Sequence, residues 1–495
     1  MSSITRIQGI AASVALRRVF AHEARLLWAD HSLWAVGGLL ALLLGFGLYN
    51  GLAEVGAREQ VLRGIQAQQP QREAALAERL QRVLAGAEKP DPFANPADPA
   101  SVGSGMGARS ALLPYAALAP LALGQSDMQP NYYRVTYRSR ASFMDDTELE
   151  SPWHLLSGPL DAAFVIVYLL PLAVLASSWN LLSAEREQGT LKLLLSQPLT
   201  ALTLAAGKVA LRAAAVLGTV ALVLGGVLLW ARPELRSAAG VAMLAQALGI
   251  VVAYALFWFA LAAAVNALGR SSAFNALAVV AAWVLLVLVL PVVMNLAVSA
   301  ASPAPSRIEL ATRTRIAAVD GLNRYNALLS ADYRYVAQPD VLLPKDGKIE
   351  VASRRRAQYL VGRDTDREIE ALIERFDTQL AGQQALVDRW SWLSPALVTN
   401  EALSALAGTG SQRYLVFRQQ VSRFHAEWKA FFEPRLLEGR AMGAADLKAL
   451  PRFAWAEPSR SDLQSGVARG ALQLLLPMLL LAGLATWRLR RLRVV

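Results

Sequence analysis

The chain has 495 residues, of which 55% are hydrophobic and 18% are charged, with a formal net charge of +11 and no cysteine. The low charged fraction, and the collection of polar residues into blocks between long uncharged runs, exclude an ordinary soluble protein and indicate an integral membrane protein. The missing cysteine excludes disulfide scaffolds and thiolate metal sites, and the positive charge lies beside apolar segments without any nucleic-acid motif, so no nucleic-acid partner is predicted.

The first predicted element is a basic amphipathic helix over residues 10–30, "IAASVALRRVFAHEARLLWAD". We expect residues 1–32 to lie along the inner membrane surface. The segment would be an elbow helix that positions the first span, or only a topology anchor. A cleaved signal peptide is not predicted, because the first apolar run begins near Leu33 and is too long for a signal core.

Six segments are long and apolar enough to cross a bilayer, which takes about 20 mostly apolar residues. They predict an all-α integral membrane protein with six transmembrane helices. The predicted spans are 33–52, 160–182, 202–230, 241–268, 273–300 and 468–487. The charged start of the third span, with Lys208 and Arg212, is expected at the cytoplasmic interface.

Lysine and arginine residues near the span ends predict the orientation, because they favour the cytoplasmic side. They gather before the first span, between the second and third, between the fourth and fifth, and in the basic tail 488–495. Both termini are therefore predicted to be cytoplasmic. The predicted location is the bacterial inner membrane.

Two large polar segments, 53–158 and 302–466, then face the other side. The first opens with a helical stretch over 57–86, and residues 131–139, "NYYRVTYRS", alternate as in a strand. The second has apolar residues at i, i+3, i+4 spacing over 366–390 and 413–435. We expect two extracytoplasmic domains that are mostly helical, with some strand in the first.

The stretch "SAEREQGTLKLLLSQP", residues 183–198, lies between the second and third spans. A charged residue at the bilayer centre costs about 2.5–3.5 kcal/mol, so the stretch must emerge into the cytoplasm. Gly189 is a natural helix end and Thr190 a natural helix start. A short helix before Pro198 would expose consecutive leucines, which favours a protein partner. The alternative is an ordinary charged loop that caps two helices.

The longer stretch "AEREQGTLKLLLSQPLT" resembles the signature of the ABC-2 class of ABC transporter permeases. In that class a Glu-x-Glu-x-Gly-Thr-Leu-x-x-Leu-Leu-x-x-Pro pattern follows the second span and forms a coupling helix that docks into a cleft of an ATPase subunit. The matching residues here are Glu185, Glu187, Gly189, Thr190, Leu191, Leu194, Leu195 and Pro198.

The resemblance implies roles for these residues. Glu185 and Glu187, with Arg186 between them, would form the coupling contact and pair with arginines of the ATPase. The three leucines of the motif would fill the cleft.

A second resemblance covers the large segment before the last span. The stretch 393–435, "LSPALVTNEALSALAGTGSQRYLVFRQQVSRFHAEWKAFFEPR", is similar to a bacterial subgroup of these permeases. That subgroup has a big insert described mainly by a domain of unknown function. The likeness covers most of 302–466 and, with the spans, nearly the whole chain.

These resemblances imply a transport subunit rather than an enzyme, and an exporter. The chain has no Gly-x-x-x-x-Gly-Lys-Ser/Thr loop, so it binds no ATP itself and no cofactor is expected on it. ATP and magnesium would lie on a separate ATPase, present in two copies per complex. A second permease, identical or paralogous, would complete the membrane part. The external domain suggests a periplasmic or outer-membrane partner.

Polar and aromatic residues in the spans are candidates for a translocation path, although hydrogen bonding between helices is the commoner role of the polar ones. The candidates are Trp179, Asn180, Gln246, Asn275 and Asn295, with Asn266 and Gln473 as further polar positions. The four histidines fall in separate regions without ligand spacing, so no metal site is predicted, and no catalytic residues are predicted.

Two other classes compete with the permease. One is a membrane-anchored scaffold or sensor whose external helices bind a partner, although its cytoplasmic parts would be very small. The other is a membrane enzyme, which would need ionisable residues grouped at one membrane face. The transported substrate stays open among drugs, polysaccharides, lipids and peptides.

Overall fold

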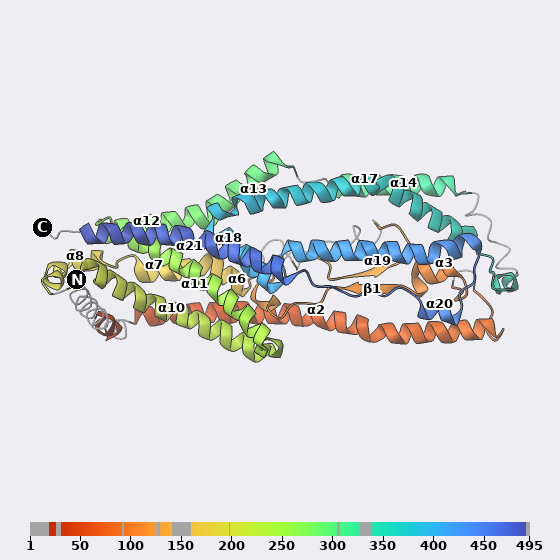
Figure 1. The fold of residues 1–495 in the computed structure, drawn as a ribbon, viewed down its shortest axis with the longest axis horizontal. Helices are drawn as coiled ribbons and strands as arrows, with labels where there is room; N and C mark the ends of the chain where they lie inside the picture. The colour runs from red at the N-terminus through yellow and green to blue at the C-terminus, as the bar shows by residue number, and fades with distance from the viewer. Residues whose placement is uncertain are drawn as a thin grey trace, which may run out of the picture.

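The molecule is an elongated, mainly helical protein (Figure 1). A bundle of apolar helices forms one end, and we call the other end, which contains the two β-strands, the second part. The computed structural model describes residues 19–25, 31–91, 94–124, 126, 129–140, 160–197, 199–303, 307–326, 338–351 and 353–491. The predicted helix over 10–30 is described only over residues 19–25, which are helical.

Six helices of the described residues are long and apolar enough to cross a membrane. This confirms the prediction of a mostly helical fold with six apolar spans. In chain order they are α2 (Ser32–Leu84); α6 (Ala162–Phe164), η4 (Val165–Leu169) and α7 (Leu170–Ser178) together; α10 (Ala201–Ala231); α11 (Ala238–Asn266); α12 (Ser272–Trp283), η6 (Val284–Val289) and α13 (Leu290–Ala301) together; and α21 (Arg460–Arg491).

The helix α11 lies at the centre of the bundle. It packs against α7, α10, α12 and α21. The side chains of Tyr254 and Trp258 on α11 are fully buried, and the Tyr254 hydroxyl donates a hydrogen bond to the Val167 carbonyl at 2.7 Å. That carbonyl belongs to η4, a single π-helical turn, and π-helical turns break the regular ladder of a helix.

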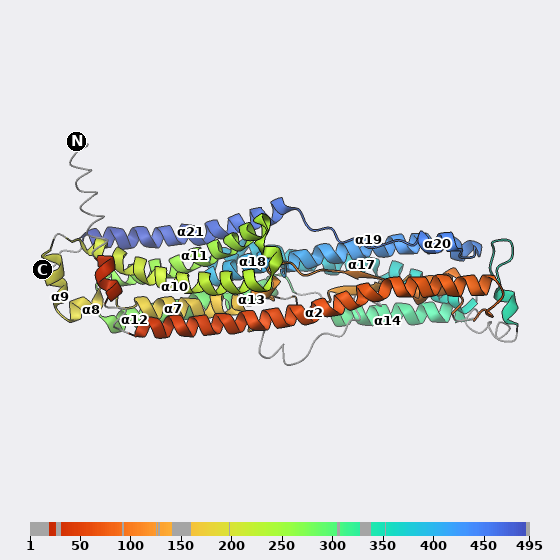
Figure 2. The same ribbon diagram turned by 90° about the horizontal axis from the view of Figure 1, so that it is seen from below.

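The first span does not end at the bundle. Sequence analysis placed a span at 33–52 and a separate helix at 57–86, whereas the structure joins them into one helix of 53 residues. At 1.5 Å per residue this helix is about 80 Å long. Figure 2 shows α2 running along the length of the molecule, from the bundle into the second part. Only Pro70 interrupts its hydrogen bonding.

The backbone of α2 comes very close to two other segments at glycines. A Cβ atom at Gly47 would lie 2.7 Å from the backbone of Asp161, and one at Gly51 would lie 2.1 Å from the carbonyl oxygen of Pro120. Pro120 belongs to η2 (Ala119–Leu121). Asp161 caps α6, since its carboxylate accepts hydrogen bonds from the amides of Phe164 and Leu123. These contacts fasten α2 to the start of the second span.

The second part contains one small antiparallel sheet. Strand β1 (Arg109–Leu112) pairs with β2 (Tyr132–Val135), with Arg109 opposite Val135. The predicted strand at 131–139 is therefore present but shorter, and its partner β1 was not predicted. Residues 141–159 lie outside the described residues.

Helices surround this sheet and form a separate aromatic core. They are α3 (Pro99–Ser101), η1 (Val102–Met106), α17 (Ser353–Trp390), α19 (Ser411–Glu438) and α20 (Ala444–Lys448), together with Leu76 and Leu80 of α2. The helix α14 (Arg307–Arg324) packs on α17 in a smaller apolar cluster, and η7 spans Pro339–Leu342. The core contains Trp428, Phe417, Phe432 and Tyr359, all nearly inaccessible to solvent. The helices predicted at 366–390 and 413–435 lie within α17 and α19.

One helix of the predicted external segment 302–466 packs inside the bundle instead. The helix α18 (Pro395–Ala407) follows the turn η8 (Ser391–Leu393) and contacts α11, α21, η4 and η6. The Ser394 hydroxyl donates to the Leu286 carbonyl of the π-helical turn η6 at 2.8 Å. Residues 302–466 are thus not a fully separate domain. With 13 residues, α18 is too short for a sequence reading to count it as a span.

The buried carboxyl of Asp98 gives the aromatic part a predicted pH dependence. Asp98 caps α3 and accepts hydrogen bonds from the Ala100 amide and the Ser101 hydroxyl, and burial raises its pKa to about 6. A raised carboxyl pKa means that the folded state binds more protons, so stability falls as pH rises from about 4 to 6 and stays lower above that. The loss should be on the order of 3 kcal/mol.

The variant Asp98→Asn keeps an acceptor for the Ala100 amide and removes the charge. We expect its thermal stability in detergent to exceed that of the wild type at pH 8 and to match it near pH 4. Melting curves between pH 4 and 8 measure this. A wild-type stability that rises over this interval would contradict the assignment.

Candidate functional site

The stretch singled out by its motif forms a helix–turn–helix at one end of the bundle (Figure 1). It consists of α8 (Ser183–Glu187) and α9 (Thr190–Leu195). Gly189 between them has φ +73°, a left-handed conformation that favours glycine. Thr190 is the first residue of α9 and Gly189 is its N-cap, so the predicted helix start is confirmed, although Thr190 is not the capping residue. The Thr190 hydroxyl instead donates to the Glu185 carbonyl at 3.2 Å.

The carboxylate of Glu185 points into the bundle. It pairs with the ammonium group of Lys208 on α10. The Lys208 Nζ also lies 3.4 Å from the carboxylate of Glu23, on the described part of the N-terminal helix. Lys208 is only 3% exposed, so it forms a buried ion pair, while its place at the cytoplasmic interface stays a prediction.

The carboxylate of Glu187 caps the next span. Its Oε1 accepts a hydrogen bond from the backbone amide of Ser272, the first residue of α12, at 2.7 Å. The Ser272 hydroxyl donates to the Ser183 hydroxyl at 2.7 Å. An anion at a helix N-terminus is favourable because the first amides lack partners within the helix. Glu187 therefore ties α8 to the fifth span.

Arg186 packs against the turn before α12. Its guanidinium lies beside Gly269, where a Cβ atom would meet Arg186 Nη1 at 3.0 Å. Gly269 also has φ +71°. The three consecutive residues 185–187 are thus occupied with contacts to α10, to this turn and to α12, which together fix the position of α8.

The leucines of α9 divide into buried and exposed positions. Leu191 is 6% exposed and packs with Val19, Leu182 and Leu489 in a small apolar cluster. Leu194 and Leu195 are partly buried against the same cluster. Leu193, which is not a motif position, is 70% exposed.

The exposed face of this segment combines positions inside and outside the motif, since Glu187, Gly189 and Thr190 are exposed as well as Leu193. It is formed by Leu193 and by the exposed polar residues Gln188, Thr190, Lys192 and Gln197. The pairing of Glu185 and Glu187 with arginines of another protein stays a prediction, although both carboxylates already have partners in this chain. Pro198 lies outside the described residues.

The candidate path residues lie at two levels of the bundle, and their role in a path stays a prediction. Asn275 is fully buried, and its amide donates to Asn266 Oδ1 at 3.1 Å. Asn266 in turn donates to the Ser178 carbonyl, next to Trp179 and Asn180, which are half-buried. These residues form a contact between helices at the α8 end.

The other two path candidates lie far from this contact. Gln246 is 20 residues from Asn266 on α11, and Asn295 is 20 residues from Asn275 along the fifth span, which is about 30 Å in each case. Gln246 is half-buried and Asn295 is exposed.

Sequence reasoning missed the residues that hold α8 in place. Lys208 and Arg212 were assigned to the membrane interface, and Glu23 and Ser272 were not singled out. One signal was available, since two cations four residues apart on an otherwise apolar helix share one face and require a carboxylate partner when they are buried.

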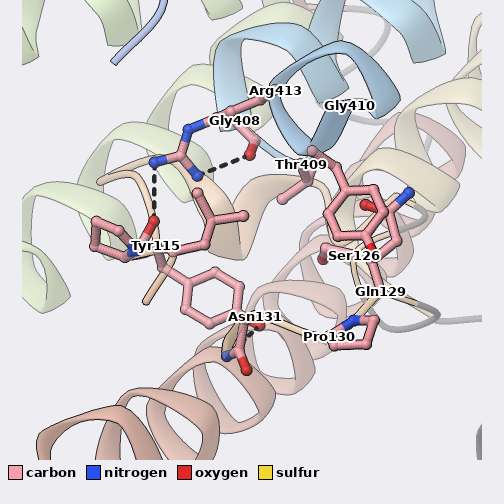
Figure 3. A pocket seen from close by; sticks show the side chains of 12 residues that line it. Tyr115, Ser126, Gln129, Pro130, Asn131, Gly408, Thr409, Gly410 and Arg413 are labelled. Atoms are coloured by element: carbon pink, nitrogen blue, oxygen red, sulfur yellow. Dashed lines mark hydrogen bonds between the residues drawn. The ribbon is translucent and has the colours of Figure 1, made fainter. Parts of the chain in front are cut away.

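A small pocket lies in the second part, beside the junction of α18 and α19 (Figure 3). Tyr115, Asn131 and Arg413 line it, and Arg413 is fixed by hydrogen bonds to the carbonyls of Pro114 and Gly408. The space inside is about 20 Å³, which is enough for about one water molecule. In this conformation the pocket holds no substrate-sized molecule.

Comparison with known proteins adds one finding. Residues 354–456 match a family described as a domain of unknown function (DUF3526). The matched residues run from α17 through α20 and include α18, the helix that packs inside the bundle. No curated protein matches the chain, and no solved structure matches it.

The apolar helices and this match together define the class of protein. The chain is a multi-pass membrane protein that carries a DUF3526 domain.

Proposed function

We propose that this chain is the membrane subunit of an ABC-2 type exporter, driven by a separate ATPase that docks on residues 183–198. The observation that carries the proposal is the α8–α9 helix–turn–helix, which presents an exposed face at the end of a bundle with six apolar spans. The motif resemblance supplies the identity of the partner. In the proposed orientation this end of the bundle is cytoplasmic, because Leu489, which lies among the arginines of the last turn of α21, packs in the same cluster as Leu191.

The docking contact is proposed to centre on Leu193. A leucine side chain that is 70% exposed on a short, supported helix suits an apolar notch in a partner, since burying it gains roughly 1.5–3 kcal/mol. The neighbouring Lys192 favours acidic residues on the partner, around the site that binds Leu193. The contacts of residues 185–187 and of Leu191 would keep the helix rigid enough to receive force.

The remaining parts of the assembly follow from the same proposal. Two ATPase chains would hold ATP and magnesium, and a second copy of this chain or a paralogue would pair with it in the bacterial inner membrane. The second part, with its DUF3526 domain, would face the periplasm and meet a partner there.

A specific observation favours one alternative, a charged loop that only caps helices. Glu187 does cap α12. That role accounts for Glu187, but it leaves the exposed Leu193 and Lys192 unexplained. A scaffold or sensor with no ATPase would then be the function to consider.

Affinity capture of the tagged full-length chain from its native host tests the proposal. We expect an ATPase bearing a phosphate-binding loop to copurify with the wild type, and Leu193→Asp to reduce its recovery at least tenfold, because a loss of about 1.4 kcal/mol or more lowers affinity tenfold. Mass spectrometry quantifies the recovered ATPase.

The matched control is Leu437→Asp, the same change at an exposed leucine on α19, which should leave recovery unchanged. If the wild-type chain recovers no ATPase, or if Leu193→Asp recovers as much as the wild type, the proposal is contradicted and the scaffold alternative is favoured.

A further inference from the structure

Four charged side chains meet inside the bundle beside α8. Glu23 and Glu185 supply two carboxylates, and Lys208 and Arg212 of α10 supply two cations. Glu23, Lys208 and Arg212 are only 6%, 3% and 7% exposed. Burying ions is costly unless each is paired and hydrogen-bonded, so the way in which these charges are paired needs a physical reason.

The pairing within this cluster is uneven. Lys208 has two carboxylate partners, Glu185 and Glu23. Among the described residues, the buried Nε and Nη1 atoms of Arg212 have no hydrogen-bond partner, and neither does Oε2 of Glu185. In the described part of the chain, one buried cation therefore has two carboxylates within ion-pair distance while the other has none, and one carboxylate oxygen accepts no hydrogen bond.

The spacing of the two cations would allow a carboxylate to change its partner from one to the other. Lys208 and Arg212 are four residues apart on α10 and so lie on one face, about 6 Å apart along the helix axis. The helix α10 begins beside α9 and runs away from it, so Arg212 lies one turn deeper in the bundle than Lys208.

We propose that Glu185 leaves Lys208 and pairs with Arg212 when α8 and α9 move about one helical turn into the bundle. Lys208 and Arg212 are thus positioning residues that hold the docking segment in two alternative registers. One-turn shifts of one element past another are a known form of switching, because packed contacts have discrete arrangements.

All four charges have partners after the exchange. Glu23 keeps Lys208, and Glu185 supplies the partner that Arg212 lacks. The position of α8 and α9 in this structure is stabilised instead by the hydrogen bond from the Ser272 amide to Glu187 and by the burial of Leu191. Opposing contributions of this kind let two registers lie close in free energy. That an ATPase supplies the push rests on the proposed function, whereas the exchange itself does not.

Distance measurements between spin labels test the exchange in the purified full-length chain. Because the sequence contains no cysteine, labels can be placed only at Gln188→Cys, in the exposed turn between α8 and α9, and at Trp230→Cys, 80% exposed near the far end of α10. The variant Lys208→Met removes the resting partner of Glu185 and should shorten the distance by about 5 Å. Arg212→Met should leave the distance at its wild-type value.

Opposite outcomes for two neighbouring cations are the distinguishing result, since a merely structural role would make both variants behave alike. Lys208→Arg keeps the charge and should keep the wild-type distance. If Lys208→Met does not yield folded protein by size-exclusion chromatography, Glu187→Ala provides the same test, because it releases α8 from Ser272 and should also shorten the distance. An unchanged distance in the folded variant, or equal changes in the Lys208 and Arg212 variants, overturns the exchange.

The same labels separate this inference from the proposed function. With copurified ATPase and ATP, the wild-type distance should shorten and that of Arg212→Met should not. If no ATPase copurifies while Lys208→Met still shortens the distance, the exchange stands and the exporter proposal fails. If ATPase copurifies but ATP shortens the distance in Arg212→Met as well, the exchange is wrong and the exporter proposal stands.

Discussion

Replacing Trp428 with alanine is expected to destabilise the second part of the molecule by about 3–5 kcal/mol. The Trp428 ring is fully buried and packs against Phe424 and Phe432, with ring centroids 6.0 and 5.1 Å away. Its indole N–H donates to the Gly103 carbonyl at 3.2 Å. The substitution leaves a cavity among aromatic rings and removes this hydrogen bond, so the loss combines both terms.

Heating the detergent-purified chain and measuring the monomer that remains should show a midpoint about 10 °C below that of the wild type. The control is Glu427→Ala, at the exposed neighbouring position on α19, which should change stability by less than about 0.5 kcal/mol. An equal effect of the two variants would mean that this aromatic cluster is not the core of the second part.

Replacing Gly51 with alanine is expected to cost about 3 kcal/mol or more, because the added methyl group would overlap the Pro120 carbonyl oxygen at 2.1 Å. The obstacle is backbone on both sides, so no side-chain rotation relieves it. Either α2 or η2 must move, and a movement of α2 also disturbs the contact of Gly47 with Asp161. We expect a large loss of folded, membrane-inserted protein.

The matched control lies on the same helix. A Cβ atom at Gly56 meets nothing within 4 Å, so Gly56→Ala should be neutral or stabilising by about 0.4–1 kcal/mol. Comparing the yield and the melting midpoint of the two variants in one detergent checks both expectations. If Gly51→Ala melts at the wild-type temperature, α2 does not approach η2 this closely.

The spans were predictable because a bilayer imposes a length and a composition that show directly in the sequence. The predicted segments 202–230 and 273–300 differ from α10 and from the helix Ser272–Ala301 by one residue at each end. The end of the first span was not predictable. Residues 53–56 become more polar and include Gly56, yet the helix continues through them, so the change in hydropathy does not mark its end.

The position of α18 inside the bundle could not be predicted from the sequence. Its 13 residues form an apolar helix that is too short to span a bilayer and is flanked by segments rich in charge. Only the contacts with α11, α21 and the π-helical turns η4 and η6 draw it into the bundle. Such tertiary contacts place α18 in the bundle, although the polarity of the surrounding sequence predicts an external segment.

At the candidate site, the sequence predicted the location and the turn but not the direction of the side chains. Gly189 has the conformation expected of a helix end. The motif gave no indication that Glu185 pairs with the buried Lys208 while Leu193 is exposed, because the motif does not include the tertiary partners of its side chains.

The length of α2 has a mechanical consequence. Arg232, just after α10, holds α2 through paired hydrogen bonds from its guanidinium to the Glu59 carboxylate at 2.9 and 3.1 Å, which places a fulcrum near the middle of a rod about 80 Å long. A tilt of about 5° around this point would swing each end sideways by roughly 3–4 Å, and in opposite directions. One continuous helix thus joins the first apolar span to the far tip of the second part, so a rigid tilt of α2 would displace both ends at once without a loop between them.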